Sequence, residues 1–297
     1  MKKIVFYLLI LFISGISSNL LMAQDLEDLL NQEMGEEITY TSATFKATRI
    51  LNGHSIERMQ EGQLDFRIHH RFGRLNSGAY ELWGLDQANI HLSLEYGLKD
   101  WIMVGVGRGT YEKTYDGFIK VSPLRQSSGA RNMPVSVSLM SGMYLNSLKW
   151  DDETRDYIFA HRLEFVNQVL VARKFSNSLS IQLMPTHLHR NLVVSALDPN
   201  DLFAMGVGGR IKLSNRVSFN AEYYHVFNQQ NQFVSTPLYS PLAIGFDVET
   251  GGHVFQFVFT NSLSMTEHGI IGNTTGNWLD GDIHFGFNIS RVFAVKK

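Results

Sequence analysis

Residues 88–107, ANIHLSLEYGLKDWIMVGVG, carry the pattern that decides the fold class. From Ala88 to Tyr96 apolar residues alternate with polar ones, and a period of two places every apolar side chain on one face of a β-strand. The turn Gly97-Leu98-Lys99-Asp100 follows directly, and a second apolar stretch starts after it. We therefore predict two antiparallel strands joined by a short turn, each with one apolar face.

The same alternation returns along the chain. It is found at residues 64–72, 135–139, 179–183, 217–223 and 283–289. Such runs indicate about twelve strands, an even number, and a strand of about ten residues can cross a bilayer when it is tilted. The polar faces carry Ser, Asn, Gln, His, Arg and Glu, which are too hydrophilic for the dry core of a small soluble barrel. They predict a polar lumen.

Short and long connections take turns between these runs. The short ones are residues 97–100, 176–177, 214–216 and 251–252, and the long ones are 73–87, 147–157, 187–201, 228–241 and 262–281. Outer-membrane barrels have this order, with short periplasmic turns and longer outer loops. The sequence thus predicts an all-β fold, a transmembrane antiparallel up-and-down β-barrel of about twelve strands that follows a cleaved signal peptide.

The composition excludes several classes of function. The chain has 297 residues and a formal net charge of -2, so it has no basic excess that would favour nucleic acid as a partner. It contains no cysteine, which excludes disulfides, a thiolate nucleophile and cysteine-ligated metal sites. We expect no cofactor.

The N-terminus has the features of a targeting segment. Lys2 and Lys3 precede an apolar run that is too short for a spanning helix, which needs about 20 residues. We interpret residues 1–23 as a signal peptide cleaved after Ala23, and residues 63–297 as the transmembrane barrel. Residues 24–62 form a periplasmic N-terminal segment in this interpretation, with an extra strand or a lumen segment as alternatives. The expected location is the cell outer membrane.

Residues 64–120, LDFRIHHRFGRLNSGAYELWGLDQANIHLSLEYGLKDWIMVGVGRGTYEKTYDGFIK, resemble an uncharacterised β-barrel family of Gram-negative bacteria, a domain of unknown function. The resemblance runs from about residue 43 to the C-terminus, and it is most distinctive in EYGLKDWIMVGVGR at residues 95–108. It implies an outer-membrane barrel. It carries no established activity, cofactor or catalytic residue.

One group of polar residues is a candidate site. The group lies on the polar faces of the first two strands and the last strand. These strands become neighbours when the barrel closes. The members of the group are Arg67, His69, Arg71, His91, Glu95 and His284. We hypothesise that they form a polar cluster in the lumen, which could coordinate a metal or narrow the pore. The alternative is that they are ordinary polar lumen residues, and we assign no metal site.

Other polar residues invite simpler explanations. His187 and His189 fall in a predicted outer loop, where such residues are usually solvated. His161 and Asn167 share the apolar parity of one strand, which an interfacial position or a β-bulge before Asn167 would explain. The glycine runs at 105–109 and 206–209 lie within strands, so we interpret them as sites of strand curvature or close lumen packing rather than phosphate loops.

These patterns favour a passive function. We expect a narrow, porin-like pore for small solutes, or a barrel whose outer loops bind a partner. The bore would be narrowed by Arg67, Glu95, Arg108, Glu164, Arg210 and Glu222. The alternatives are an outer-membrane enzyme acting on lipid or surface polymer, for which no Gly-x-Ser-x-Gly elbow is found, and an adaptor that holds a periplasmic partner. The lipid bilayer and the barrel-assembly machinery are the other expected partners.

Overall fold

The computed structural model describes residues 37–150, 156–196, 198–227 and 237–295. Two compact units are present. In the smaller one, β1 (Ile38–Tyr40) pairs antiparallel with β6 (Ser127–Gly129). The larger one contains the barrel. The expected signal peptide and its cleavage after Ala23 lie outside the described residues.

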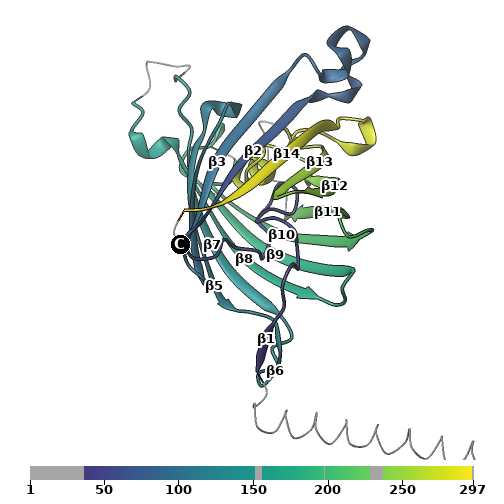
Figure 1. Ribbon diagram of the computed structural model, residues 1–297. Coiled ribbons are helices and arrows are strands. Elements are labelled where there is room, and N and C mark those ends of the chain that lie inside the picture. The colour runs from purple at the N-terminus through teal and green to yellow at the C-terminus, as the bar shows by residue number, and fades with distance from the viewer. Residues whose placement is uncertain (1–36, 151–155, 197, 228–236, 296–297) are drawn as a thin grey trace, which may run out of the picture. The chain divides into compact units, whose positions relative to one another are not determined.

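Twelve strands of the described chain form a closed barrel (Figure 1). The strands are β2 (Gln63–Arg74), β3 (Ala88–Lys99), β4 (Ile102–Gly109), β5 (Tyr115–Leu124), β7 (Ser136–Leu145), β8 (Leu163–Lys174), β9 (Leu179–Arg190), β10 (Asp201–Lys212), β11 (Val217–Val226), β12 (Leu242–Thr250), β13 (His253–Thr260) and β14 (His284–Ala294). Each pairs antiparallel with the next along the chain, and β14 pairs with β2 to close the ring. The predicted up-and-down barrel and its strand number are confirmed.

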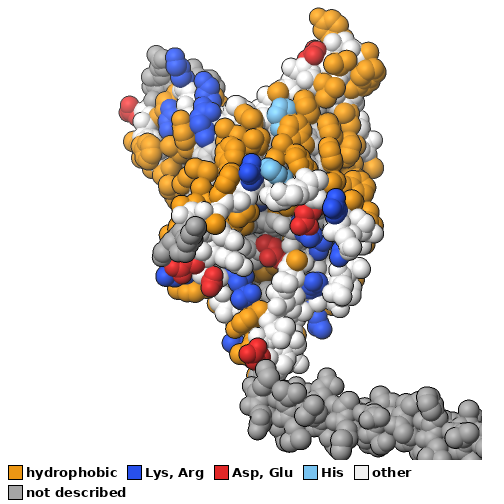
Figure 2. All heavy atoms as spheres, in the orientation of Figure 1, with side chains coloured by type: hydrophobic (Ala, Val, Ile, Leu, Met, Phe, Trp, Pro, Cys, Tyr) orange, Lys and Arg blue, Asp and Glu red, His pale blue; other side chains and the backbone are white. Residues whose placement is uncertain are grey.

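The alternating residues of the sequence face the lumen and the outer surface in turn. On β3, Leu92 and Leu94 are exposed on the outer surface, whereas His91, Ser93 and Glu95 are buried inside. On the face seen in Figure 2, hydrophobic side chains gather over the strands. Among the described residues no helix is long and apolar enough to cross a membrane.

The interior is less polar than the sequence predicts. Many inward residues of β7 to β10 are apolar, and they pack with residues that precede β2 and with α3 (Glu267–Gly272), which is buried throughout. The shared cluster includes Phe45, Ile50, Leu51, Met140, Val166, Leu170, Met184, Leu188, Leu202, Ile270 and Ile271. The polar lumen that the sequence predicts is therefore only part of the interior, because the chain fills its own lumen and the filling includes a packed apolar core.

Strands β9 and β10 extend further than the sequence predicts. His187 and His189 belong to β9 and pair with Phe203 and Asp201 of β10. The prediction of an outer loop at these histidines is wrong, because the β9–β10 ladder continues to the first residue of β10. The true connection is correspondingly shorter.

Two glycine runs allow close packing in the lumen. A Cβ atom added at Gly105 would overlap the ring of Phe118, and one at Gly208 would overlap Ile50 Cδ1. These contacts confirm the interpretation of the runs as sites of close lumen packing. The inward positions of β4 are Met103, Gly105, Gly107 and Gly109, so Arg108 faces outward over the Tyr115 ring, and its expected inward position is wrong.

A charge on the outer surface tests whether that surface faces lipid. We expect Leu94→Arg to lower the free energy of unfolding by about 2–4 kcal/mol, the cost of an arginine near the bilayer midplane. Urea titration of protein folded into phosphatidylcholine vesicles measures this, with Leu94→Ala as the matched control. Equal stability of the two variants would mean that Leu94 does not contact lipid.

Candidate functional site in the barrel lumen

The centre of the barrel is occupied by residues 44–59, here called the lumen segment. Most of its residues are buried, although it belongs to no strand of the wall. It turns back on itself at Asn52-Gly53, where Ile50 N donates to Gly53 O at 2.9 Å and Ser55 N donates to Thr48 O at 2.8 Å. Asn-Gly is a favourable pair for such a tight turn.

Wall side chains hold the main chain of this turn from several directions. The Glu222 carboxylate on β11 accepts from the backbone N–H groups of Leu51, Asn52 and Gly53 at 2.8–3.3 Å. Amide side chains of the wall donate to the backbone carbonyl oxygens. These are Gln182 to His54 at 2.8 Å, Gln256 to Ile50 at 2.8 Å and Asn288 to Leu51 at 2.7 Å. Partners on β9, β11, β13 and β14 place the turn inside the ring.

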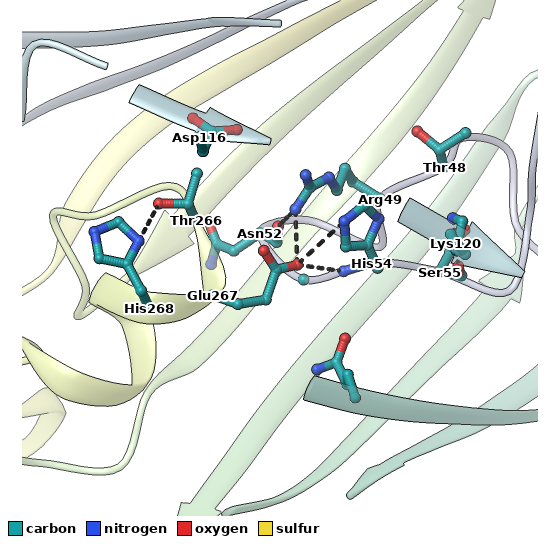
Figure 3. A network of polar contacts seen from close by, with 12 residues as sticks. Thr48, Arg49, Asn52, His54, Ser55, Asp116, Lys120, Thr266, Glu267 and His268 are labelled. Carbon is teal, nitrogen blue, oxygen red and sulfur yellow. Dashed lines mark hydrogen bonds and ion pairs between the residues drawn. The ribbon is translucent and has the colours of Figure 1, made fainter. Parts of the chain in front are cut away.

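A second carboxylate joins the lumen segment to α3. Glu267 Oε1 accepts from Arg49 Nη1 at 2.7 Å and from the His54 backbone N–H at 3.0 Å (Figure 3). Its other oxygen accepts from the Tyr144 hydroxyl at 3.0 Å. Arg49 also lies 3.5 Å from Glu95 Oε1 on β3. The lumen is thus closed by two elements that are bound to each other.

The charges of this network are complementary. Burial alone would lower the pKa of Arg49, but the Glu267 and Glu95 carboxylates raise it, so the guanidinium stays charged. Burial and the positive charges of Arg49 and Lys120 lower the pKa of His54 well below its usual value. His54 is therefore neutral, and Arg49 is the cationic partner of Glu267 among the described residues.

Five of the six candidate lumen residues lie together on β2 and β3. Arg67, His69, Arg71, His91 and Glu95 are all buried, and His69 pairs directly with His91 across the two strands. The two imidazole rings stack with centroids 5.6 Å apart. Neither ring nitrogen of His69 has a hydrogen-bond partner among the described residues, whereas His91 Nε2 lies 2.6 Å from Asp116 Oδ1.

The charged members of this group bind the lumen segment. Arg67 donates to Thr48 Oγ1 at 2.8 Å and pairs with Asp65 at 2.7 Å. Arg71 donates to Asn52 Oδ1 at 2.7 Å. Glu95 accepts from the Thr48 hydroxyl. These charged side chains of the wall therefore hold the lumen segment in place through hydrogen bonds.

The structure leaves His284 apart from the other five. On β14 it is Asn288, four residues away, that pairs with His69, which separates the two histidines by about 13 Å along the strand. His284 Nδ1 lies 2.9 Å from Phe72 O, and the residue borders a polar hollow of about 240 Å³ with Arg74 and Tyr111. Within the described ranges no three His, Asp or Glu side chains are grouped so that they could hold a metal ion.

The two unusual residues near β8 have different explanations. His161 lies in the 3₁₀ helix η4 (Phe159–Arg162), before the strand begins. Asn167 is exposed on the outer face of β8 and accepts a hydrogen bond from the Ser141 hydroxyl at 2.8 Å. The β7–β8 register runs without interruption, so the interpretation of a β-bulge before Asn167 is wrong.

Sequence reasoning missed Arg49, Glu222 and Glu267 as one network. Glu222 stood out as an inward charge on a strand, but its partners are backbone N–H groups, which no side-chain pattern reveals. Arg49 and Glu267 lie 218 positions apart, in segments without clear periodicity. A glutamate in a long loop is ordinarily a solvated residue.

The Glu222 carboxylate can be tested as the anchor of the lumen segment. We expect Glu222→Ala to lower the free energy of unfolding by about 2–3 kcal/mol, because it leaves buried N–H groups without a charged acceptor. Trypsin should then cleave after Arg49, which is 2 % exposed in the intact barrel. Urea titration and mass analysis of the tryptic fragments measure both effects.

Glu222→Gln is the matched control, since it keeps one acceptor oxygen at the same position. It should lose less stability than Glu222→Ala and resist cleavage after Arg49. If Glu222→Ala is as stable and as resistant as the wild type, Glu222 does not anchor the segment.

Comparison with known proteins shows low similarity to solved structures. The NanC porin is 9% identical, with a TM-score of 0.47, over 79% of this chain and 100% of that chain. An outer membrane channel from Pseudomonas putida F1 is 11% identical, with a TM-score of 0.46, over 80% of this chain and 98% of that chain. Omp33 of Acinetobacter baumannii is 9% identical, with a TM-score of 0.40, over 78% of this chain and 99% of that chain.

No curated protein sequence matches the chain. One family model matches residues 45–293, a range that contains the whole barrel wall apart from its last residue and nearly all of the lumen segment. Its description agrees with the closed ring of strands and their apolar outer faces. The chain belongs to the family of the membrane bound beta barrel domain, DUF5777.

Proposed function

We propose that this chain is an outer-membrane channel for small polar solutes, closed by its own lumen segment. The observation that carries the proposal is that residues 44–59 fill the interior without forming part of any wall ladder. All wall pairs join strands from β2 to β14, so displacement of the segment would leave the ring of hydrogen bonds intact. This distinguishes the proposal from a permanently open pore.

A polar path exists on one side of the interior. Arg67, Arg71, Glu95 and Lys120 project inward from β2, β3 and β5 and contact the lumen segment. If the segment left, these side chains would line the opened space with charges of both signs. A mixed lining suits small polar or zwitterionic solutes rather than one type of ion.

The entrance in this proposal is the polar hollow at the ends of the strands near the long connections. Its lining comes from several connections and strand ends, and it holds Arg74, Ser77, Gln87, Tyr111, Asn261, Leu263, Asn273, Thr275 and His284. Arg74 is fixed there by Asp282 at 3.1 Å. The mixture of amides, hydroxyls and one cation can bind polar groups of a solute.

The apolar contacts of the lumen segment explain why the closed state would be stable. Phe45, Ile50 and Leu51 of the lumen segment are buried with the apolar inward residues of β8 to β10. Opening exposes this apolar surface to water, whereas the polar contacts can be replaced by hydration. Opening therefore requires a partner or a bound solute to compensate for the lost apolar burial.

The same proposal includes the route to the membrane. Residues 1–23 act as a signal peptide cleaved after Ala23, and the barrel-assembly machinery inserts the wall. The support is the charged start of the chain followed by an apolar run, together with a last strand of alternating pattern that contains Phe293. A periplasmic partner would contact residues 25–42.

Planar-bilayer recording tests the channel. We expect few or no current steps from the refolded wild type and frequent steps from Gly208→Phe, because an aromatic ring there takes the place of Ile50 in the lumen. Deletion of residues 44–57 should give long-lived openings. Gly209→Phe is the matched control, since a Cβ at Gly209 meets only Ser180 O at 3.8 Å, and it should stay closed.

A heat-modifiable band in detergent establishes that each variant is folded. A folded deletion variant without current would refute the channel. A wild type with the same openings as the deletion variant would refute closure by the lumen segment.

A further inference from the structure

The outer surface of the barrel has a hollow that the channel does not use. This outer groove has a volume of about 630 Å³ and crosses β5, β7, β8, β9 and β10. Most of its walls are apolar and outward-facing, including Leu139, Val169, Phe203 and Met205. On a membrane barrel such a surface meets lipid chains rather than water.

The ladder of paired residues between β8 and β9 is interrupted beneath the groove. Pro185 of β9 has no N–H to donate, and the β8–β9 pairing passes from Gln168↔Thr186 to Val171↔Leu183 without pairs between them. The inward residues Gln168 and Thr186 consequently reach the floor of the groove. The hollow lies over this interruption of the ladder.

A row of polar side chains lies across the apolar surface. Ser141, Asn167 and His187 are cross-strand neighbours on β7, β8 and β9, and all three line the groove. His187 Nε2 and His189 Nδ1 both lie 2.8 Å from Asp201 Oδ1, which fixes His187 in place. Polar groups that face hydrocarbon are costly unless they find partners.

Asn167 is the donor of this row. Its Oδ1 accepts from the Ser141 hydroxyl at 2.8 Å, so the amide is oriented and its N–H groups, on Nδ2, remain for another acceptor. Among the described residues Nδ2 has no hydrogen-bond partner. Asn167 is the fifth of the twelve residues of β8, and His187 lies three residues before the last residue of β9, so both lie in the half of their strands next to the long connections.

We propose that the outer groove binds one acyl lipid through its ester linkage. The ester carbonyl accepts a hydrogen bond from Asn167 Nδ2, and the acyl chain lies along Leu139, Val169 and Met205. An ester carbonyl is a strong hydrogen-bond acceptor that acyl lipids carry at the polar end of their hydrocarbon chains. The site depends on membrane insertion alone and is independent of the proposed channel.

The geometry fits binding and not hydrolysis. Ser141 and His187 are separated by β8, so their strands are about 10 Å apart. The Ser141 hydroxyl donates to Asn167 rather than to an imidazole, and His187 bonds to Asp201. A serine nucleophile needs a base within hydrogen-bond reach.

Native mass spectrometry of the full chain in dodecyl maltoside tests this site. The probes are diester phosphatidylethanolamine and its diether analogue, which lacks the ester carbonyl. We expect the wild type to retain one diester lipid about tenfold more tightly than the diether lipid, the effect of one hydrogen bond of about 1.4 kcal/mol. Asn167→Leu should lose this preference, and Val169→Phe, which fills the groove, should weaken retention of both lipids.

His70→Leu is the matched control, because His70 lies on the outer face of β2, outside the groove, and stacks on Phe287. It should retain the preference for the diester lipid. Equal retention of both lipids by the wild type would overturn the proposal, as would an equal loss of preference in His70→Leu. Release of fatty acid from the diester lipid, abolished in Ser141→Ala, would also overturn it in favour of hydrolysis.

Discussion

The pairing of β14 with β2 is the contact on which the rest of the structure depends. Without it, the first and last strands would each present a row of unpaired N–H and C=O groups to hydrocarbon, where no water can satisfy them. Ten residue pairs from Gln63↔Ala294 to Arg74↔His284 satisfy these groups. Closure also separates the lumen from the outer surface. Each strand therefore has one face toward the lumen and one toward the membrane, and its side chains alternate accordingly.

The inside imposes a second constraint, because a filled lumen must satisfy buried charges as well as pack. Glu222 meets this need with backbone N–H groups, and Glu267 meets it with Arg49 and a backbone N–H. Breaking one partner of such a set leaves a buried charge uncompensated, which costs more than an ordinary lost contact. The apolar cluster on β7 to β10 lies beside this network. The lumen segment therefore contacts charged side chains of the wall in one part and apolar side chains in another.

The outer surface carries a row of polar side chains among its apolar residues. Ser141, Asn167 and His187 lie where the ladder beside Pro185 is interrupted, and the same strands carry the apolar inward residues that hold the lumen segment. Strands β8 and β9 thus carry apolar inward residues such as Val166 and Met184, and each also has one polar member of the row on its outer face. Strands β2 and β3, in contrast, have charged residues inside.

The sequence by itself determined the strands, their number and the face of each residue on β3, because a period of two is a local property of the chain. It also indicated the inward position of Arg67 and Glu95. Only the tertiary structure decided that residues 44–59 occupy the lumen, that Glu267 binds Arg49 from 218 positions away, and that register leaves His284 apart from His69. These depend on partners brought together by ring closure, and a local pattern holds no information about the register of distant strands.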